Sequence, residues 1–397
     1  MTSLLKTDLR GACALSRPSR AGRTSPPLRL LSLAAGCAAL LWAGPATASA
    51  EEAGLLRAHG ESSALRVEKD AEGWRLITAR ASQGSSFAAD SLRLPLSAAA
   101  RAERLSAHGE SWLLTATTSD GAAAAPRLVI LRGTADGTLE QLPSPTAASP
   151  VLLRPTVLAD ERAEPVAALW IEGESFEGTA VRSSRWTGAG WTEAEILSPG
   201  GGPGSQLALD AERLDDGSLL AVWSAFDGED DEILWSLLPA GISAQWTEPR
   251  PLSANAVPDV TPTVTAVEGG ALVAWSGYRQ GHYRIWQRRW SGSEWGEAQS
   301  MGGKGSVSPA YTFESLASPV LMFRQTVPSA WRVLQMNADG STERSASLEP
   351  ATNSRRPPNL EAVTDAGVVV AAPPAAAATK AEGTLVPWQE LPVSERR

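Results

Sequence analysis

The chain has almost no cysteine. Its 397 residues include two cysteines, Cys13 and Cys37, and both lie in the first fifty residues. The remaining 347 residues therefore contain no disulfide, no thiolate metal site and no catalytic thiol. A chain of that length can bury a large hydrophobic core without such cross-links.

Long apolar runs and helical patterns are also scarce beyond the first fifty residues. The nearest to a membrane span is Val368 to Ala378, which is too short and is interrupted by Pro373 and Pro374. No stretch shows helical periodicity over three turns. The sequence also lacks a Gly-x-Ser-x-Gly nucleophile motif, a His-x-x-x-His pair and a phosphate-binding glycine loop. These absences argue against a transmembrane helix, a helical fold and several common enzyme classes.

The first fifty residues have the pattern of a secretory signal peptide. Basic residues precede an apolar segment from Leu30 to Gly44, and Ala48-Ser49-Ala50 offers small residues for cleavage. We expect residues 1–50 to be removed, so that the mature chain begins at Glu51 in the periplasm or outside the cell. Lipoprotein processing at Cys37, with a lipid anchor, is the alternative. The apolar segment continues past Cys37, which favours the first interpretation.

The mature chain is acidic. Residues 51–397 contain 29 Lys or Arg and 43 Asp or Glu, a net charge of −14. Binding to nucleic acid or to anionic lipid needs clustered basic side chains. We therefore exclude nucleic acid as a partner, whereas a neutral glycan, a cation or a basic protein stays compatible.

A sequence unit of about 50 residues recurs along the mature chain. Trp186-Thr-Gly-Ala-Gly-Trp191 is repeated as Trp290-Ser-Gly-Ser-Glu-Trp295. Short apolar runs end in aromatic residues that are 53, 52 and 48 residues apart, namely Trp170, Trp223, Trp275 and Phe323. Each run follows a turn signal, as expected for a strand buried on both faces. Repeats of this length and composition predict an all-β propeller with four-stranded blades.

The spacing favours six blades, with seven as the alternative. Central strands are expected near Thr117, Trp170, Trp223, Trp275, Phe323 and Ala371. We expect one propeller domain over 51–397, with recognisable repeats in 106–390. Residues 51–105 match the repeat less well and would supply ring-closing strands or an irregular blade. Several units open with a proline, which suits the first residue of a strand; these are Pro155, Pro262, Pro309 and Pro358.

Most tryptophans have a structural explanation. Large aromatic residues at equivalent blade positions pack between neighbouring sheets. This group comprises Trp170, Trp191, Trp223, Trp246, Trp275 and Trp295. Less regular positions leave glycan stacking open for Trp235, Trp286, Trp290 and Trp331.

Over roughly residues 110 to 390, the apolar run ending in Trp, the Gly-containing hairpin and the outer Trp unit resemble the sialidase-like propellers of exported bacterial proteins. The Asp-box turn of that group survives as fragments at Ala135-Asp-Gly137-Thr138 and Ala338-Asp-Gly340-Ser341. The Arg-Ile-Pro motif of sialidases is absent. What the resemblance implies for a catalytic site is a Tyr311 nucleophile with Glu314, and arginines that hold the substrate carboxylate: Arg154, Arg324 and Arg356. The alternative is that Arg154 and Arg356 are ordinary solvated or ion-paired rim residues.

Two hairpin sequences at matched positions carry opposite charges. The segment 226–232 is strongly acidic and could bind Ca²⁺ through Asp227, Asp230 and Asp231. A solvated hairpin tip is the plainer interpretation. The segment 278–284 suits a sugar or carboxylate ligand, through Tyr278, Arg279, His282, Tyr283 and Arg284. Alternatively, the two hairpins could simply pair with each other across the rim.

These observations favour an exported, non-catalytic propeller that binds a glycan or an envelope protein on one ring face. We expect a monomer, and no cofactor unless Ca²⁺ binds the acidic hairpin. The alternatives are a sialidase-like glycoside hydrolase and a scaffold or assembly factor of the cell envelope.

Overall fold

The computed structural model of the chain describes residues 56–59, 63–81, 87–108, 111–119, 125–134, 137–145, 149–198, 208–241, 244–313, 318–348, 358, 360–370 and 384–389. The chain divides into two units, Met1–Gly44 and Pro45–Arg397, and every described residue belongs to the second. The predicted signal peptide, 1–50, lies outside the described residues, so its cleavage stays a prediction.

The described strands form seven antiparallel sheets, and the strands of each sheet lie side by side in chain order. The first contains β1 (Leu56–His59), β2 (Ser63–Asp70), β3 (Gly73–Ala81) and β4 (Phe87–Arg93). The second contains β5 (Arg101–His108), β6 (Ser111–Thr118), β7 (Arg127–Thr134) and β8 (Leu139–Leu142). The third contains β9 (Val151–Ala159), β10 (Pro165–Gly173), β11 (Ala180–Arg185) and β12 (Glu195–Ser198). A short 3₁₀ turn, η2 (Phe176–Gly178), connects β10 to β11.

The remaining four sheets repeat the same meander. The fourth contains β13 (Ala208–Arg213), β14 (Leu219–Phe226), β15 (Asp231–Leu238) and β16 (Arg250–Pro251). The fifth contains β17 (Asp259–Val267), β18 (Gly270–Arg279), β19 (His282–Trp290) and β20 (Gln299–Met301). The sixth contains β21 (Ser306–Phe313), β22 (Val320–Thr326), β23 (Ser329–Met336) and β24 (Thr342–Leu348). The last has three strands, β25 (Leu360–Thr364), β26 (Gly367–Val370) and β27 (Thr384–Pro387).

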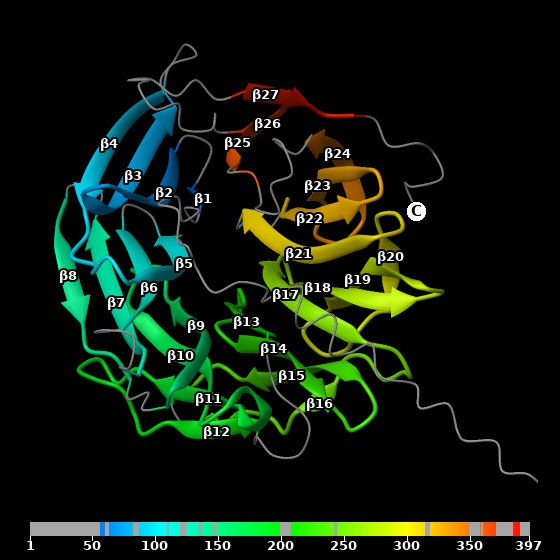
Figure 1. Ribbon diagram of the computed structural model, residues 1–397, viewed down its shortest axis with the longest axis horizontal. Coiled ribbons are helices and arrows are strands. Elements are labelled where there is room, and N and C mark those ends of the chain that lie inside the picture. The colour runs from blue at the N-terminus through cyan, green and yellow to red at the C-terminus, as the bar shows by residue number, and fades with distance from the viewer. Residues whose placement is uncertain are drawn as a thin grey trace, which may run out of the picture. The chain divides into compact units, whose positions relative to one another are not determined.

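The sheets follow one another around a common axis, with the first strand of each nearest to it (Figure 1). Successive first strands contact one another from β1 through β5, β9, β13 and β17 to β21, and β1 also contacts β21 and β25. The predicted all-β propeller of four-stranded blades is confirmed. Seven sheets are described because 56–93 forms a complete sheet of its own, as the seven-bladed alternative required.

The hydrophobic core is divided into clusters that lie between consecutive sheets. Trp223 of β14 packs against Leu169 and Ile171 of the preceding sheet, and Trp170 packs in the same way against Leu113. Trp223 and Trp170 have 0% of their surface exposed, and Trp275 has 2%. The predicted inter-sheet role of these tryptophans is confirmed, and it follows from strands that are apolar on both faces.

The irregular tryptophans are also largely buried, which corrects the idea that they are open for stacking on a glycan. Trp235, Trp290 and Trp331 are buried, and Trp286 is partly buried. Trp235 lies 5.2 Å from Trp290, measured between ring centroids, in the core between the fourth and fifth sheets. These side chains therefore stabilise the sheet packing.

Among the described residues there is no helix whose length and hydropathy would suit membrane crossing.

Candidate functional site

Three first strands contain a strained residue directly before a proline. The backbone angle φ is 49° at Arg154, 53° at Thr261 and 55° at Ser308, and the strand register shifts at each position. Pro155 and its two counterparts thus lie inside strands and follow a bulge, which corrects their expected place at the first strand residue. A bulge interrupts the ladder, so the missing N–H of proline costs nothing there.

The strain at these positions points to a function. A left-handed backbone costs a non-glycine residue about 1–2 kcal/mol. Such strain is retained mainly at functional sites, and a bulge re-aims the side chain that it carries. The bulged first strands are therefore the best candidates for a ligand-binding site.

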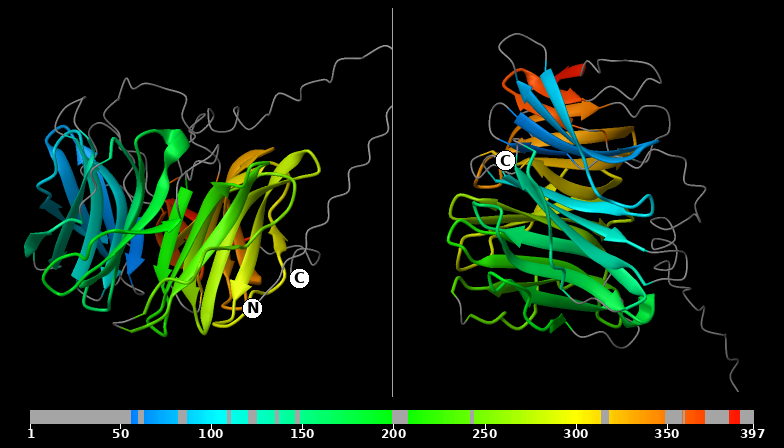
Figure 2. Two further views of the ribbon diagram at one scale, coloured as in Figure 1. Left: turned by 90° about the horizontal axis from the view of Figure 1, so that it is seen from below. Right: turned by 90° about the vertical axis from the view of Figure 1, so that its left-hand side faces the viewer.

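The strand pairing places the three bulges at one face of the propeller. The start of β9 pairs with the end of β10, the start of β17 with the end of β18, and the start of β21 with the end of β22. The bulges and the hairpins that link second to third strands therefore share one face, which we call the bulge face. Figure 2 shows the strands running between the two faces. The acidic and aromatic hairpins predicted from the sequence both lie on the bulge face.

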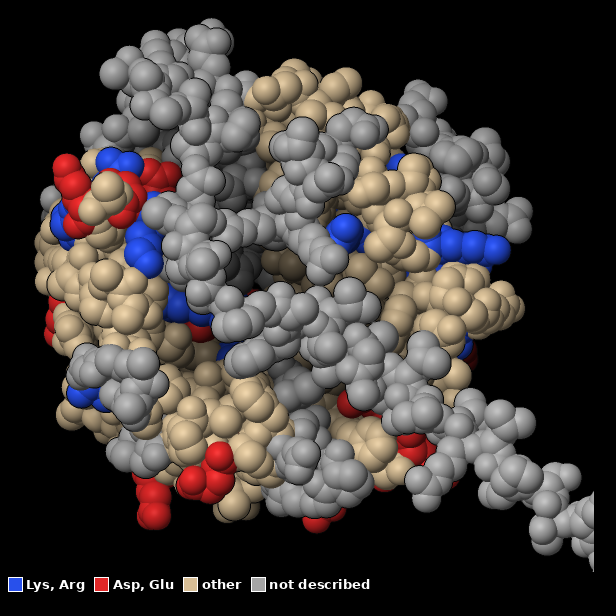
Figure 3. Space-filling view, viewed as in Figure 1, with Lys and Arg blue, Asp and Glu red and all other residues tan. Residues whose placement is uncertain are grey.

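A buried ion-pair network crosses the first strands. Arg104 of β5 donates to Asp210 at 2.9 Å and to Glu212 at 2.8 Å, both on β13. Arg104 is 7% exposed, and β9 contacts both β5 and β13, so the pairs join the strands on either side of β9. Asp210 also accepts a hydrogen bond of 2.9 Å from Thr263 Oγ1 of β17. The network thereby connects three sheets near the axis. Figure 3 shows basic and acidic atoms beside the central hollow.

Arg154 differs from Arg104 because its guanidinium has no hydrogen bond or ion pair within the described part of the chain. Its side chain is exposed to solvent. Desolvation by the surrounding protein nevertheless lowers its pKa, with repulsion from Arg101 adding to the effect and Glu103 and Asp210 opposing it. Arg154 can therefore donate its hydrogen bonds to a ligand.

The residues of the predicted ligand hairpin, β18–β19, lie close together, but some of their side chains already bond to other protein groups. Tyr278 and Tyr283 make an edge-to-face contact with 5.2 Å between ring centroids, and both are half-exposed. Arg284 donates to His282 Nε2 at 3.0 Å. Arg279 makes a bidentate pair with Asp259 at 3.1 and 3.0 Å. Arg279 therefore holds the fold together at the start of β17.

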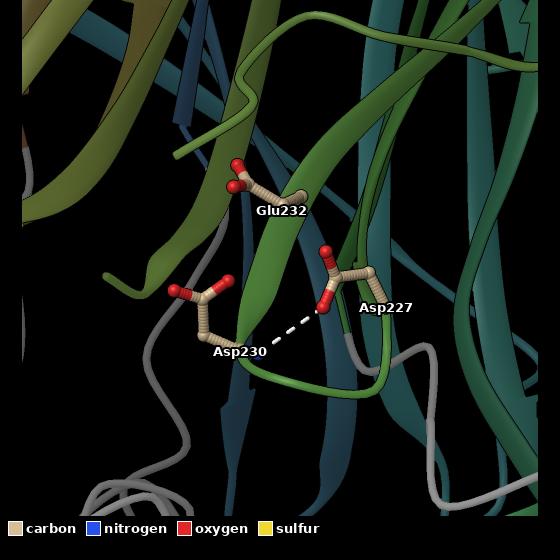
Figure 4. A group of neighbouring side chains, drawn as sticks. All are labelled: Asp227, Asp230 and Glu232. Carbon is tan, nitrogen blue, oxygen red and sulfur yellow. Dashed lines mark hydrogen bonds between the residues drawn. The ribbon is translucent and has the colours of Figure 1, made fainter. Parts of the chain in front are cut away.

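The acidic hairpin brings three carboxylates together. Oxygens of Asp227, Asp230 and Glu232 all lie within 4.8 Å of one another (Figure 4). Asp231, predicted as a metal ligand, is outside this group, and Glu232 takes its place. The reason is the two-residue alternation of a strand, which turns residues 230 and 232 to one side and residue 231 to the other.

The two buried carboxylates of this hairpin have different surroundings. Glu232 accepts hydrogen bonds from Ser253 Oγ and from the backbone N–H of Asn255. Asp230 is 8% exposed, and neither of its carboxylate oxygens has a hydrogen-bond donor. Burial, together with repulsion from Glu232 and the other acids nearby, raises the pKa of Asp230 to about 6. The acidic and aromatic hairpins are connected indirectly. Asn255 Nδ2 donates to both Glu232 and Asp259, and Asp259 pairs with Arg279.

Three of the catalytic residues suggested by the sialidase resemblance lie in the described part of the chain, namely Tyr311, Arg154 and Arg324. Tyr311 is 7% exposed and its hydroxyl donates to Gln287 at 3.1 Å. Burial raises the pKa of Tyr311, which disfavours the phenolate that a nucleophile needs. Arg324 is half-buried on β22, while Glu314 and Arg356 lie outside the described residues. The charged residues that do meet near the axis were not anticipated from the sequence, because Arg104 and Asp210 are 106 residues apart.

Comparison with known proteins supports the fold and names no family. No family model matches the chain, and no curated protein matches it. The polysaccharide lyase Uly1 aligns with a TM-score of 0.51 at 10% identity, covering 87% of this chain and 91% of that one. An ulvan lyase of polysaccharide lyase family PL25, solved with a bound GlcA–Rha3S saccharide, aligns with a TM-score of 0.51 at 9% identity, covering 84% and 91%.

A six-bladed fucose-binding lectin from Aleuria aurantia aligns with a TM-score of 0.46 at 11% identity, covering 76% of this chain and 98% of the lectin. The arrangement of the sheets confirms the propeller fold that the sialidase resemblance implied, and nothing further of that resemblance.

Proposed function

We propose that the protein is a non-catalytic carbohydrate-binding propeller whose ligand occupies the bulge face. The observation that carries this proposal is Arg154: an exposed guanidinium, without a protein partner among the described residues, held on a strained bulge beside the axis. A guanidinium offers paired donors to a carboxylate, a sulfate or adjacent hydroxyls. The neighbouring Glu103 and Asp210 favour the charged form of this guanidinium. An acidic saccharide matches this arrangement best.

Two further features support the choice of ligand class. The half-exposed pair Tyr278 and Tyr283 lies on the same face and offers aromatic surface to a sugar ring. The two structures that align at a TM-score of 0.51 are both polysaccharide lyases by name. Their likeness extends to the fold alone, so the residues of the bulge face provide the argument for carbohydrate.

The surroundings of Tyr311 favour binding without hydrolysis. A sialidase-type reaction needs an accessible tyrosine whose proton is removed by a neighbouring carboxylate. Here the phenol is buried and donates to an amide oxygen of Gln287. Gln287 in turn donates to the backbone carbonyl of Gly340 at 2.9 Å. This chain of bonds ties the fifth sheet to the sixth, which is a structural role.

Substitution of Arg154 tests the proposal. We expect Arg154→Ala to weaken binding of an acidic oligosaccharide by about 10- to 100-fold, the usual loss when a charged hydrogen-bond donor is removed. The measurement is isothermal titration with uronate-containing and sialylated oligosaccharides that a glycan array selects. Arg162→Ala is the matched control, because Arg162 is exposed in the β9–β10 turn on the opposite face. Equal affinities for the two variants, or no saccharide bound by the wild type, would refute the proposal.

We also propose that the protein is exported before it acts, as a monomer outside the cytoplasm. The support is the N-terminal sequence, in which small residues at Ala48 and Ala50 follow an apolar segment. We expect the exported species to begin at Glu51, as read by N-terminal sequencing and intact mass. A species that begins with a lipidated Cys37 would instead establish a membrane-anchored protein.

A further inference from the structure

The carboxylate cluster at the β14–β15 hairpin has the composition of a site for a hard cation. Asp227, Asp230 and Glu232 contribute oxygens that lie within 4.8 Å of one another. Two oxygens bound to the same Ca²⁺ can be up to about 5 Å apart, since each lies about 2.3–2.6 Å from the ion. Mg²⁺ holds its ligands closer and keeps most of its water. Zn²⁺ sites are built mainly on nitrogen and sulfur ligands.

Asp230 is the feature that separates this cluster from an ordinary acidic loop. Its side chain is 8% exposed and points at the other two carboxylates, yet both of its oxygens lack a donor. A buried carboxylate without a partner is strongly unfavourable, and native proteins almost always satisfy such a group. Asp227 and Glu232 differ, because Asp227 accepts from the backbone N–H groups of Glu229 and Asp230. Glu232 accepts from Ser253 Oγ and from the backbone N–H of Asn255.

No basic side chain compensates the cluster. Within the described ranges, Asp227, Asp230 and Glu232 take part in no salt bridge. The nearby arginine, Arg279, makes its ion pair with Asp259. Desolvation and mutual repulsion raise the pKa of Asp230 above its ordinary value. Close carboxylates without a cation repel one another, and a bound cation relieves that repulsion.

We propose that Asp227, Asp230 and Glu232 bind a Ca²⁺ ion on the bulge face. The ion neutralises the buried carboxylates and connects the β14–β15 hairpin to the segment that precedes β17. Asn255 is the link, because its backbone N–H and its side chain both donate to Glu232 while Nδ2 also donates to Asp259 at 2.7 Å. Bound Ca²⁺ thereby stabilises the hydrogen bonds and the ion pair that connect the acidic hairpin, through Asp259 and Arg279, to the aromatic hairpin.

The test uses CaCl₂ and the mature protein, after treatment with EGTA and removal of the chelator. We expect one Ca²⁺ per chain with a dissociation constant at or below about 1 mM. Saturating Ca²⁺ should raise Tm by at least about 3 °C, whereas MgCl₂ at the same concentration should raise it much less. Carbohydrate is not added, so the result is independent of the proposed ligand.

Three variants locate the ion. Asp230→Asn should abolish both the binding heat and the Ca²⁺-dependent rise in Tm, and should be at least as stable as the wild type in EGTA. Asp227→Asn, at an exposed position, should also abolish them and decides the question if Asp230→Asn does not fold. Glu229→Gln is the matched control, since it removes one charge from the same hairpin and should keep the full response. A wild type that ignores Ca²⁺, or a response that survives in both aspartate variants, would overturn the proposal.

Discussion

Replacing Trp223 by alanine is expected to lower the free energy of unfolding by about 3–5 kcal/mol, the range for large buried aromatic side chains. The indole has 0% of its surface exposed and packs against Leu169, Ile171 and Val181 of the preceding sheet. Its removal opens a cavity between two blades that rigid strands cannot collapse to fill. The measurement is urea-induced unfolding, followed by tryptophan fluorescence and by circular dichroism.

Three companion substitutions separate packing from hydrogen bonding. Trp191→Ala should cost less, because Trp191 is only partly buried, although its indole donates to Pro143 O at 2.7 Å. Trp223→Phe should also be mild, since the Trp223 indole N–H has no acceptor among the described residues. Trp170→Phe should cost more than Trp223→Phe, because Trp170 donates to the buried Glu172 at 2.9 Å. Unchanged stability in Trp223→Ala would contradict the placement of these residues between blades.

Replacing Arg104 by alanine is expected to cost about 3–5 kcal/mol, as in other proteins where one partner of a buried ion pair is removed. The substitution leaves Asp210 and Glu212 without their common cation, with side chains 22% and 14% exposed. Thr263 and the backbone of Val264 still donate to Asp210 and moderate the loss there. Thermal and urea unfolding at neutral pH give the magnitude.

The matched control for Arg104 is Arg344 on the outer strand β24. Arg344 is 33% exposed and pairs with Glu343 at 3.2 Å, so Arg344→Ala should cost no more than about 1 kcal/mol. Combining Arg104→Met with Asp210→Leu and Glu212→Leu should recover much of the stability lost in Arg104→Ala, because apolar side chains can replace a buried ion network. Similar losses for Arg104→Ala and Arg344→Ala would show that the network near the axis is not buried.

The repeat could be predicted from the sequence because its period and its buried positions are local properties. An apolar run ending in Trp170, Trp223 or Trp275 identifies the second strand of a blade wherever it occurs. The first sheet was harder to recognise because 56–93 lacks that ending. Its Trp74 begins the third strand instead of ending the second. The prolines were placed at strand starts because a bulge leaves no mark in composition.

The site could be predicted only in part, for two physical reasons. Glu232 was missed as a member of the carboxylate cluster. Which acids of the hairpin point to the same side depends on the residue at which β15 begins, and the sequence does not give that residue. Arg104 and Asp210 were missed because their contact depends on how the first strands of different sheets meet near the axis. Arg154 was identified through the sialidase resemblance, and its strained bulge and its exposed guanidinium emerged only in three dimensions.

Strain at Arg154 also separates stability from function. Glycine adopts a positive φ without steric cost, so Arg154→Gly should keep or slightly raise the stability of the fold. The same change removes the guanidinium proposed to bind the ligand. A variant that is as stable as the wild type yet defective in binding is the pattern expected of a residue retained for function.

A crystal structure with a bound oligosaccharide tests the central claim most directly. The saccharide would be the tightest ligand from the array, soaked or co-crystallised with the mature protein. We predict that it lies on the bulge face, with an anionic or hydroxyl group within hydrogen-bond distance of the Arg154 guanidinium. A saccharide on the opposite face, or at the outer edge of the blades beside Trp191 and Trp295, would contradict the proposed function.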